Sequence, residues 1–121
     1  MPVILVLDDD AATRNALVET LRQLFAWVRV ATGPGDASPG VVAREGASVV
    51  LASMPAVERL CRNGAPAGVP VVALTREMSP DTLMRAEALG AAGALRTPAG
   101  AEQLAAVLGP MLDAPPPRDV R

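Results

Sequence analysis

Short runs of apolar residues recur along this chain, and helical patterns separate them. The first run, Val3–Leu7, has no polar alternation, which suits a strand covered on both faces, as in a parallel sheet. Because strands that alternate with helices over short loops form a parallel sheet with helices on both sides, the sequence predicts a doubly wound α/β fold. The five predicted strands are Val3–Leu7, Trp27–Ala31, Ser48–Ala52, Val69–Leu74 and Gly93–Arg96.

Start and stop signals for helices lie between the predicted strands. Asp10 is placed to cap a first helix, because its carboxylate can accept the free amide hydrogens of the first turn. The apolar stripe of that helix is Leu17, Leu21, Leu24 and Val28, and that of the last helix is Leu104, Val107, Leu108 and Met111. Further helix starts are predicted at Ser38-Pro39, Pro55, Ser79-Pro80 and Pro98, and helix ends at Gly46, Asn63-Gly64 and Gly90.

The chain length of 121 residues fits one domain, predicted over residues 1–113, with the proline-rich residues 114–121 as a tail or linker. A formal net charge of -2, with Phe25 and Trp27 as the only aromatic residues, argues against direct nucleic-acid binding. No stretch is long enough to span a membrane, and the apolar opening is too short for a signal peptide, so a cytoplasmic protein is expected. The single Cys61 and the lack of histidine exclude an internal disulfide and a common zinc site.

Functional residues are expected at the carboxyl ends of the strands, because parallel sheets bind their ligands there. The residues predicted at these ends are Asp8 to Asp10, Thr32, Leu51 to Ser53, Thr75-Arg76 and Arg96-Thr97.

The order of the motifs at these strand ends resembles the receiver domain of bacterial response regulators. The segments that carry the resemblance are Val6–Asp10 with Arg14, Met54-Pro55, Pro70–Thr75 and Ala88–Pro98. The resemblance implies the flavodoxin-like receiver fold, with strand order 2-1-3-4-5, and a part in two-component phosphorelay signal transduction. It also implies a mechanism in which acids of the first strand hold Mg²⁺ and an aspartate of the third strand accepts a phosphoryl group. A Thr or Ser and a Lys then grip that group, and an aromatic residue of the fifth strand reports the change to a partner.

The phosphoacceptor position departs from the family pattern. Counted back from the Met-Pro pair that begins at Met54, it falls on Leu51, which has no nucleophile and cannot ligate a metal. If the third strand were shifted, Ser53 or Ser48 would face the site, and neither is a normal acceptor. The chain is therefore expected to be an atypical receiver that is not phosphorylated on aspartate.

Three further positions depart in the same direction. The lysine position falls on Thr97, which has no charge for a phosphoryl group, and the aromatic switch position falls on Ala94. The residue after Thr75, usually small in the family, is Arg76. Acceptor, lysine and switch ring are thus lost together, which favours a receiver that passes information by contact.

The first-strand acids are expected to hold a metal weakly or not at all. Mg²⁺ requires several oxygen ligands in octahedral order, and a leucine at the acceptor position removes one ligand and one charge. Weak binding at Asp8 and Asp9 is the most that remains, and no cofactor is expected. Arg76 is predicted to pair with Asp8 or Asp9 through its guanidinium group, in place of metal and lysine. Thr75 is expected to cap or bond locally.

Two functions from different classes follow. The first is an interaction module. The resemblance implies a contact face on the fourth helix, fifth strand and fifth helix, and this face carries a mixed-charge set suited to a homodimer or a protein partner. That set is Asp81, Arg85, Glu87, Arg96 and Glu102. Receivers without the aspartate also respond to inputs other than phosphorylation, so the resemblance leaves the input signal open.

The second is a phosphatase. The segment from Asp8 to Thr13 also resembles the first motif of haloacid-dehalogenase-type enzymes. That resemblance implies Asp8 as the nucleophile, Asp10 as the general acid and Thr75 as a second-motif hydroxyl. The lysine near the fifth strand and the acid pair that such enzymes need for Mg²⁺ are missing, so a non-enzymatic role is favoured.

Overall fold

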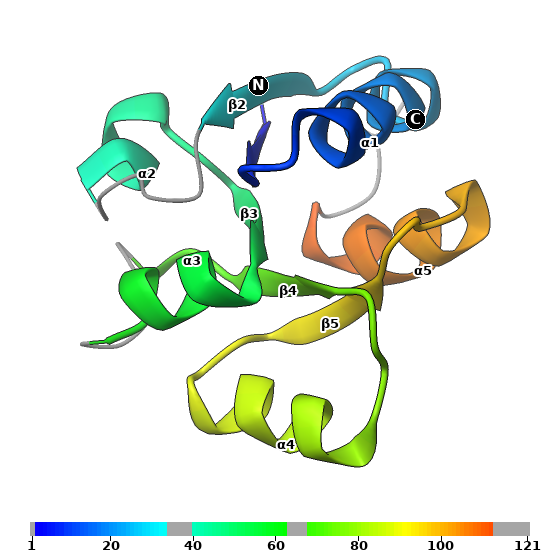
Figure 1. Cartoon of the computed structure of the whole chain (residues 1–121). Coiled ribbons are helices and arrows are strands. Elements are labelled where there is room, and N and C mark those ends of the chain that lie inside the picture. The colour runs from blue at the N-terminus through cyan, green and yellow to red at the C-terminus, as the bar shows by residue number, and fades with distance from the viewer. Residues whose placement is uncertain (1, 34–39, 63–67, 113–121) are drawn as a thin grey trace.

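The computed structural model describes residues 2–33, 40–62 and 68–112, which form five parallel strands and five helices. The sheet has the order β2-β1-β3-β4-β5, which confirms the predicted fold class and strand order (Figure 1). The strands are β1 (Val3–Leu7), β2 (Arg29–Gly33), β3 (Val49–Ser53), β4 (Val71–Thr75) and β5 (Gly93–Arg96). The helices are α1 (Ala11–Leu24), α2 (Gly40–Glu45), α3 (Met54–Leu60), α4 (Pro80–Ala88) and α5 (Ala101–Met111).

The sheet separates two hydrophobic cores, because successive side chains of each strand point to opposite faces. Helices α1 and α5 cover one face, and α2, α3 and α4 cover the other (Figure 1). All five residues of β1 are buried, as the unbroken apolar run predicted. The first core includes Ile4, Val6, Leu51, Val72, Leu74, Leu95 and Leu104, and the second includes Leu5, Leu7, Val50, Ala52, Val57 and Ala73.

Three strands lie one or two residues later in the chain than the sequence predicted. β2, β3 and β4 end at Gly33, Ser53 and Thr75. Val28, predicted to continue the stripe of the first helix, lies beyond it, since α1 ends at Leu24. Val28 is nevertheless buried in the first core, because the backbone turns back after Phe25. This turn is closed by the Val28 amide, which donates to the Phe25 carbonyl oxygen at 2.9 Å.

The helix signals are mostly confirmed. The Asp10 and Ser79 side chains accept from the amides of Ala12 and Thr82, which caps α1 and α4. Gly46 and Gly90 follow α2 and α4 with φ of +66° and +95°, a region that side chains disfavour.

The predicted start of the last helix at Pro98 is wrong. α5 begins at Ala101 after Gly100, and Pro98 belongs to the connection from β5, joined to Thr97 by a cis peptide bond. The signals at Ser38-Pro39 and Asn63-Gly64, and the predicted tail at residues 114–121, lie outside the described residues.

Two bulk expectations can be followed in the structure. None of the helices described is long and apolar enough to cross a membrane. Cys61 is a free, buried thiol at the end of α3, and burial raises the pKa of that thiol.

Candidate functional site

The carboxyl ends of β1, β3, β4 and β5 surround a polar hollow of about 240 Å³. The sequence predicts functional residues at these strand ends, and several of the predicted residues line this hollow. The hollow is lined by Asp8, Asp10, Thr13, Ser53, Met54, Pro55, Leu74, Thr75, Arg76 and Thr97.

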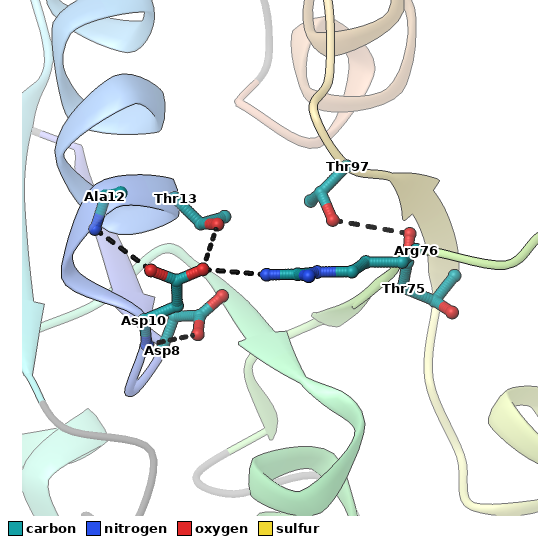
Figure 2. A network of polar contacts seen from close by, with 7 residues as sticks. All are labelled: Asp8, Asp10, Ala12, Thr13, Thr75, Arg76 and Thr97. Carbon is teal, nitrogen blue, oxygen red and sulfur yellow. Dashed lines mark hydrogen bonds and ion pairs between the residues drawn. The ribbon is translucent and has the colours of Figure 1, made fainter.

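Asp10 is the centre of the polar network in this hollow (Figure 2). Its Oδ1 accepts from the Ala12 amide at 3.1 Å, and its Oδ2 accepts from the Thr13 hydroxyl at 2.8 Å. The hydrogen bond from the Thr13 side chain, backbone hydrogen bonds from Thr13 and Ala12, and the charge of Arg76 lower the pKa of Asp10, although partial burial opposes them. Asp10 is therefore held as a carboxylate.

Arg76 reaches from the end of β4 to this carboxylate. Its Nη2 lies 2.8 Å from Oδ2 of Asp10, with the arginine side chain 78% exposed and the aspartate side chain 40% exposed. The predicted arginine–carboxylate pair is thus present, but its acid is Asp10 and not Asp8 or Asp9. The choice of Asp10 follows from its position before α1, where the cap hydrogen bonds fix its carboxylate toward β4 (Figure 2).

Asp8 is turned toward its own loop. Its Oδ1 accepts from the Asp10 amide at 2.9 Å, and its carbonyl oxygen accepts from Nη1 of Arg14 at 2.7 Å. Asp9 is exposed. Among the residues that the structure describes, no group of three or more acids, cysteines or histidines is arranged to hold a metal ion. Asp8 and Asp10 are the acids that line the hollow, and Asp10 is already paired with Arg76, so Asp8 is the lining carboxylate that can still offer Mg²⁺ a ligand.

Leu51 does not lie at the carboxyl end of β3. It pairs with Val6 of β1 and Val72 of β4 in mid-strand, and its side chain is fully buried in the first core. Two residues further, Ser53 ends β3 and lines the polar hollow with Asp8. Leu51 and Ser53 point to the same face of the sheet, since side chains alternate with a period of two. The alternative of a shifted third strand therefore describes the geometry better than the count from Met54.

Ser48, the other serine of that alternative, lies at the opposite end of the strand. Its hydroxyl accepts from the Val3 amide at 3.3 Å, far along the sheet from Asp8. Of the two serines, only Ser53 lines the hollow. The reason that counting placed the position at Leu51 is that α3 begins directly at Met54, so the strand ends closer to the Met-Pro pair than in the family pattern.

The two threonines of the site differ in their bonding. The Thr75 hydroxyl donates to the Glu77 carbonyl oxygen at 2.9 Å and accepts from the Glu77 amide at 3.2 Å, which confirms the predicted local role. Thr97 is only 8% exposed, and its hydroxyl lies 3.5 Å from the Thr75 carbonyl oxygen. Thr97 is thus at the site, as predicted, with an uncharged side chain.

The predicted switch position and interaction face lie away from this hollow. Ala94 is half-buried and packs against the second core, on the side of α4. All five residues of the predicted face are exposed: Asp81, Arg85, Glu87, Arg96 and Glu102. Arg85 is not a free charge, because it forms an ion pair with Glu58 of α3. Thr32, the candidate at the end of β2, is exposed and does not line the hollow.

Two features of the site escaped the sequence analysis. Thr13 binds the Asp10 carboxylate, a contact that its position three residues after a capping aspartate signals. The second feature is the connection from Thr97 to Ala99, which lines a hollow together with Thr13 of α1 and Arg76. No local pattern signals that contact, because it depends on the packing of α5 against α1.

Comparison with known proteins places the fold. No family model matches the chain, and no curated sequence matches it. The signal receiver domain of a DNA-binding response regulator from Colwellia psychrerythraea 34H superposes with a TM-score of 0.77 at 20% identity, covering 93% of this chain and 99% of that chain. Chemotaxis protein CheY4 of Vibrio cholerae gives 0.76 at 23% identity, covering 92% and 98%.

A response regulator from Burkholderia multivorans is 28% identical, with a TM-score of 0.72 and coverage of 98% of this chain and 99% of that chain. These structures agree with the five-stranded parallel order of the sheet. The chain thus has the fold of the response regulator receiver domains, as its sequence motifs predicted.

Proposed function

We propose that this chain is an atypical receiver domain, which works through protein contacts and is not phosphorylated on aspartate. The observation that carries the proposal is the residue at the tip of β3. Ser53 ends β3 and lines the hollow with Asp8, which supports taking it as the residue that replaces a phosphoacceptor carboxylate. A serine hydroxyl offers neither the metal-binding charge nor the acyl-phosphate chemistry of a carboxylate.

The rest of the hollow supports the same conclusion. Thr97 brings no positive charge to a phosphoryl group, and Arg76 reaches across the hollow to Asp10. A guanidinium bound to Asp10 brings a positive charge beside the first-strand acids, where a divalent cation would otherwise bring one. One acid of the hollow is therefore neutralised by a side chain of the protein itself, without an incoming metal.

The phosphatase alternative meets a specific obstacle. A general acid must carry its proton at the working pH. The hydrogen bonds of Thr13 and the charge of Arg76 instead lower the pKa of Asp10, which favours its ionised form. Asp10 is thus poorly suited to protonate a leaving group, and a non-enzymatic role is the better account.

The surface made by α4, β5 and α5 is the proposed contact face. The face carries charges of both signs, with Arg85 already paired to Glu58, so a partner with complementary charges gains favourable pairs across it. Apolar side chains are exposed beside these charges, with Met84 69% exposed, Leu83 41% and Met78 37%. A charged rim around apolar side chains is typical of protein interfaces.

Acetyl phosphate with Mg²⁺ tests the chemical half of the proposal. The full chain is incubated with both, and its intact mass is compared with that of an untreated sample and of a sample treated with EDTA. We expect no added phosphoryl group under either condition. A stable phosphoryl adduct that requires Mg²⁺ and disappears in Asp8→Asn would contradict the proposal.

A matched pair of charge reversals tests the contact face. Arg96→Glu lies on β5 within the face, and Arg22→Glu lies on the exposed side of α1, so both change the net charge equally. Sedimentation velocity over a concentration series measures self-association. The same two variants can be compared for their affinity for a partner protein. We expect Arg96→Glu to weaken association and Arg22→Glu to leave it unchanged, whereas equal behaviour of the two removes this face as the interface.

A further inference from the structure

A second, larger hollow lies beside the polar one, between α1 and the connection that joins β5 to α5. Its volume is about 410 Å³, within the range of small-molecule sites, while the polar hollow is smaller. The side chains that surround it are mostly apolar, as in typical ligand sites. They are Ala12, Thr13, Ala16, Leu17, Thr20, Arg76, Thr97, Pro98 and Ala99.

Thr97 is an unusual member of this lining. It is the only buried polar residue in the described part of the chain. Its hydroxyl has a single hydrogen bond there, to the Thr75 carbonyl oxygen at 3.5 Å, well beyond the usual 2.7–2.8 Å for two oxygens. A buried hydroxyl with so weak a partner retains both donor and acceptor capacity, and a better partner in the hollow would satisfy it.

Arg76 brings a cation to the same place, because it lines both hollows together with Thr13 and Thr97. Only one hydrogen bond of its guanidinium, from Nη2 to Asp10, is present among the described residues, out of the five N–H donors of the group. Figure 2 shows the Arg76 side chain extended from the side of Thr75 and Thr97 toward the Asp10 carboxylate. A planar guanidinium with free donors binds a carboxylate in a fork.

We propose that this larger hollow binds a small carboxylate with an apolar body. The head group lies against Arg76 and the Thr97 hydroxyl, and the body lies along Ala12, Ala16 and Leu17 of α1 opposite Pro98. This is a site separate from the contact face, and it gives the domain an input that does not require phosphorylation. The site is independent of how the contact face is used.

The charge of Asp10 should affect how tightly the hollow binds a carboxylate. Asp10 already occupies part of the Arg76 guanidinium, so it competes with an incoming carboxylate. Replacing Asp10 by asparagine keeps an oxygen for the helix cap and removes the competing charge. Affinity for a carboxylate must then rise, whereas affinity for a neutral ligand of the same shape has no reason to change.

Octanoate and octanamide are suitable probes, used on the full chain below the micelle concentration of octanoate and followed by amide NMR titration. We expect octanoate to bind with a Kd below ~10 mM and to shift the amides of Ala16, Thr97 and Ala99. Octanamide should bind about 10-fold more weakly, a difference equal to one charge-assisted contact.

Four variants locate the ligand. Arg76→Gln and Thr97→Val should each weaken octanoate binding, the first by about 10-fold. Ala16→Leu fills the hollow from an exposed position of α1 and should abolish binding. Ala88→Leu makes the same change on α4, across the sheet, and should have no effect.

Several results overturn the proposal. They are an affinity for octanoate weaker than ~10 mM, equal binding of octanamide, unchanged binding in Ala16→Leu, or weaker octanoate binding in Asp10→Asn. The amide spectrum of each variant reports whether it is folded. If Ala16→Leu fails to fold, Thr97→Val and Arg76→Gln decide the outcome, because neither places a larger group in the core.

Discussion

The tip of β3 offers the sharpest test of how the site is built, because the sequence and the structure assign the phosphoacceptor position to different residues. A carboxylate placed at Leu51 or at Ser53 by a single substitution distinguishes the two assignments. If the structure is right, Leu51→Asp buries a charge in the middle of the sheet, and Ser53→Asp places one at its polar edge.

The expected magnitudes differ widely. Truncating a fully buried leucine costs about 2–5 kcal/mol. Keeping an unpaired carboxyl at that depth shifts its pKa upward by about 3–5 units, so the folded protein holds it mostly protonated at about pH 7. The cost at this pH is then limited by the distance from the unfolded pKa of about 3.9, which at 1.36 kcal/mol a unit is roughly 4 kcal/mol. The sum, roughly 6–9 kcal/mol, is comparable with the whole stability of a typical domain, about 5–15 kcal/mol. At the half-buried Ser53, repulsion from Asp8 in water costs on the order of 1 kcal/mol.

Urea denaturation measures the difference, with circular dichroism and the fluorescence of the single Trp27 as independent probes. We expect Leu51→Asp to be unfolded or to lose most of its transition, and Ser53→Asp to fold with a modestly lower midpoint. Mg²⁺ should then raise the free energy of unfolding of Ser53→Asp by about 1.4 kcal/mol at ten times Kd, because the new carboxylate joins the first-strand acids, and the urea midpoint should rise accordingly. Ser53→Asn, of the same shape without the charge, should show no response to Mg²⁺.

The opposite outcome would refute the reasoning. A folded Leu51→Asp that is stabilised by Mg²⁺, beside a Ser53→Asp that is not, would mean that β3 lies two residues away from its place in the structure. The pairing of Leu51 with Val6 and Val72 would then be incorrect. Leu51 would then stand at the site in place of Ser53, and the argument for the proposed function would pass to the leucine, which also lacks a carboxylate.

Three further predictions follow from the same contacts. Arg76→Ala should lower the melting temperature at neutral pH and low salt, because it removes the ion pair with Asp10. The difference from the wild type should shrink in high salt, which screens exposed ion pairs. Equal melting curves at low salt would show that the pair contributes nothing to stability. Because the pKa of Asp10 is lowered in the folded chain, its contribution to stability is present above the unfolded pKa and is lost as pH falls through the lower folded value. Asp10→Asn should therefore flatten the acid side of the pH–stability curve below about pH 4, measured by thermal melts, and an unchanged acid limb would contradict this. Ser79→Ala removes the cap of α4 and should cost about 1 kcal/mol in urea denaturation, whereas Ser79→Asp should retain most of that stability.

Local patterns in the sequence were enough to predict the fold class. The buried run of β1 and the alternation of strands with helices predicted the parallel sheet, and both are confirmed. The caps at Asp10 and Ser79 were predicted correctly because a capping bond joins residues two or three apart, so the whole interaction is written in one segment. The motifs at the strand ends likewise predicted the receiver fold, since their order along the chain follows the order of the strands.

Three features of the site were decided only by the tertiary structure. Leu51 and Ser53 share one face of β3, so a period of two cannot tell which of them reaches the edge; that depends on the register with β1 and on the start of α3. The partner of Arg76 is Asp10, because the cap of α1 orients the Asp10 carboxylate toward the end of β4. The two residues lie 66 positions apart in the chain, so no local pattern predicts their contact.

The hollow beside Thr97 exists only where α1 meets the connection into α5. The sequence determines which residues are apolar, charged or suited to a cap, because these properties belong to single side chains and their near neighbours. The distances between segments far apart in the chain arise from packing, and the chemistry of this site depends on those distances.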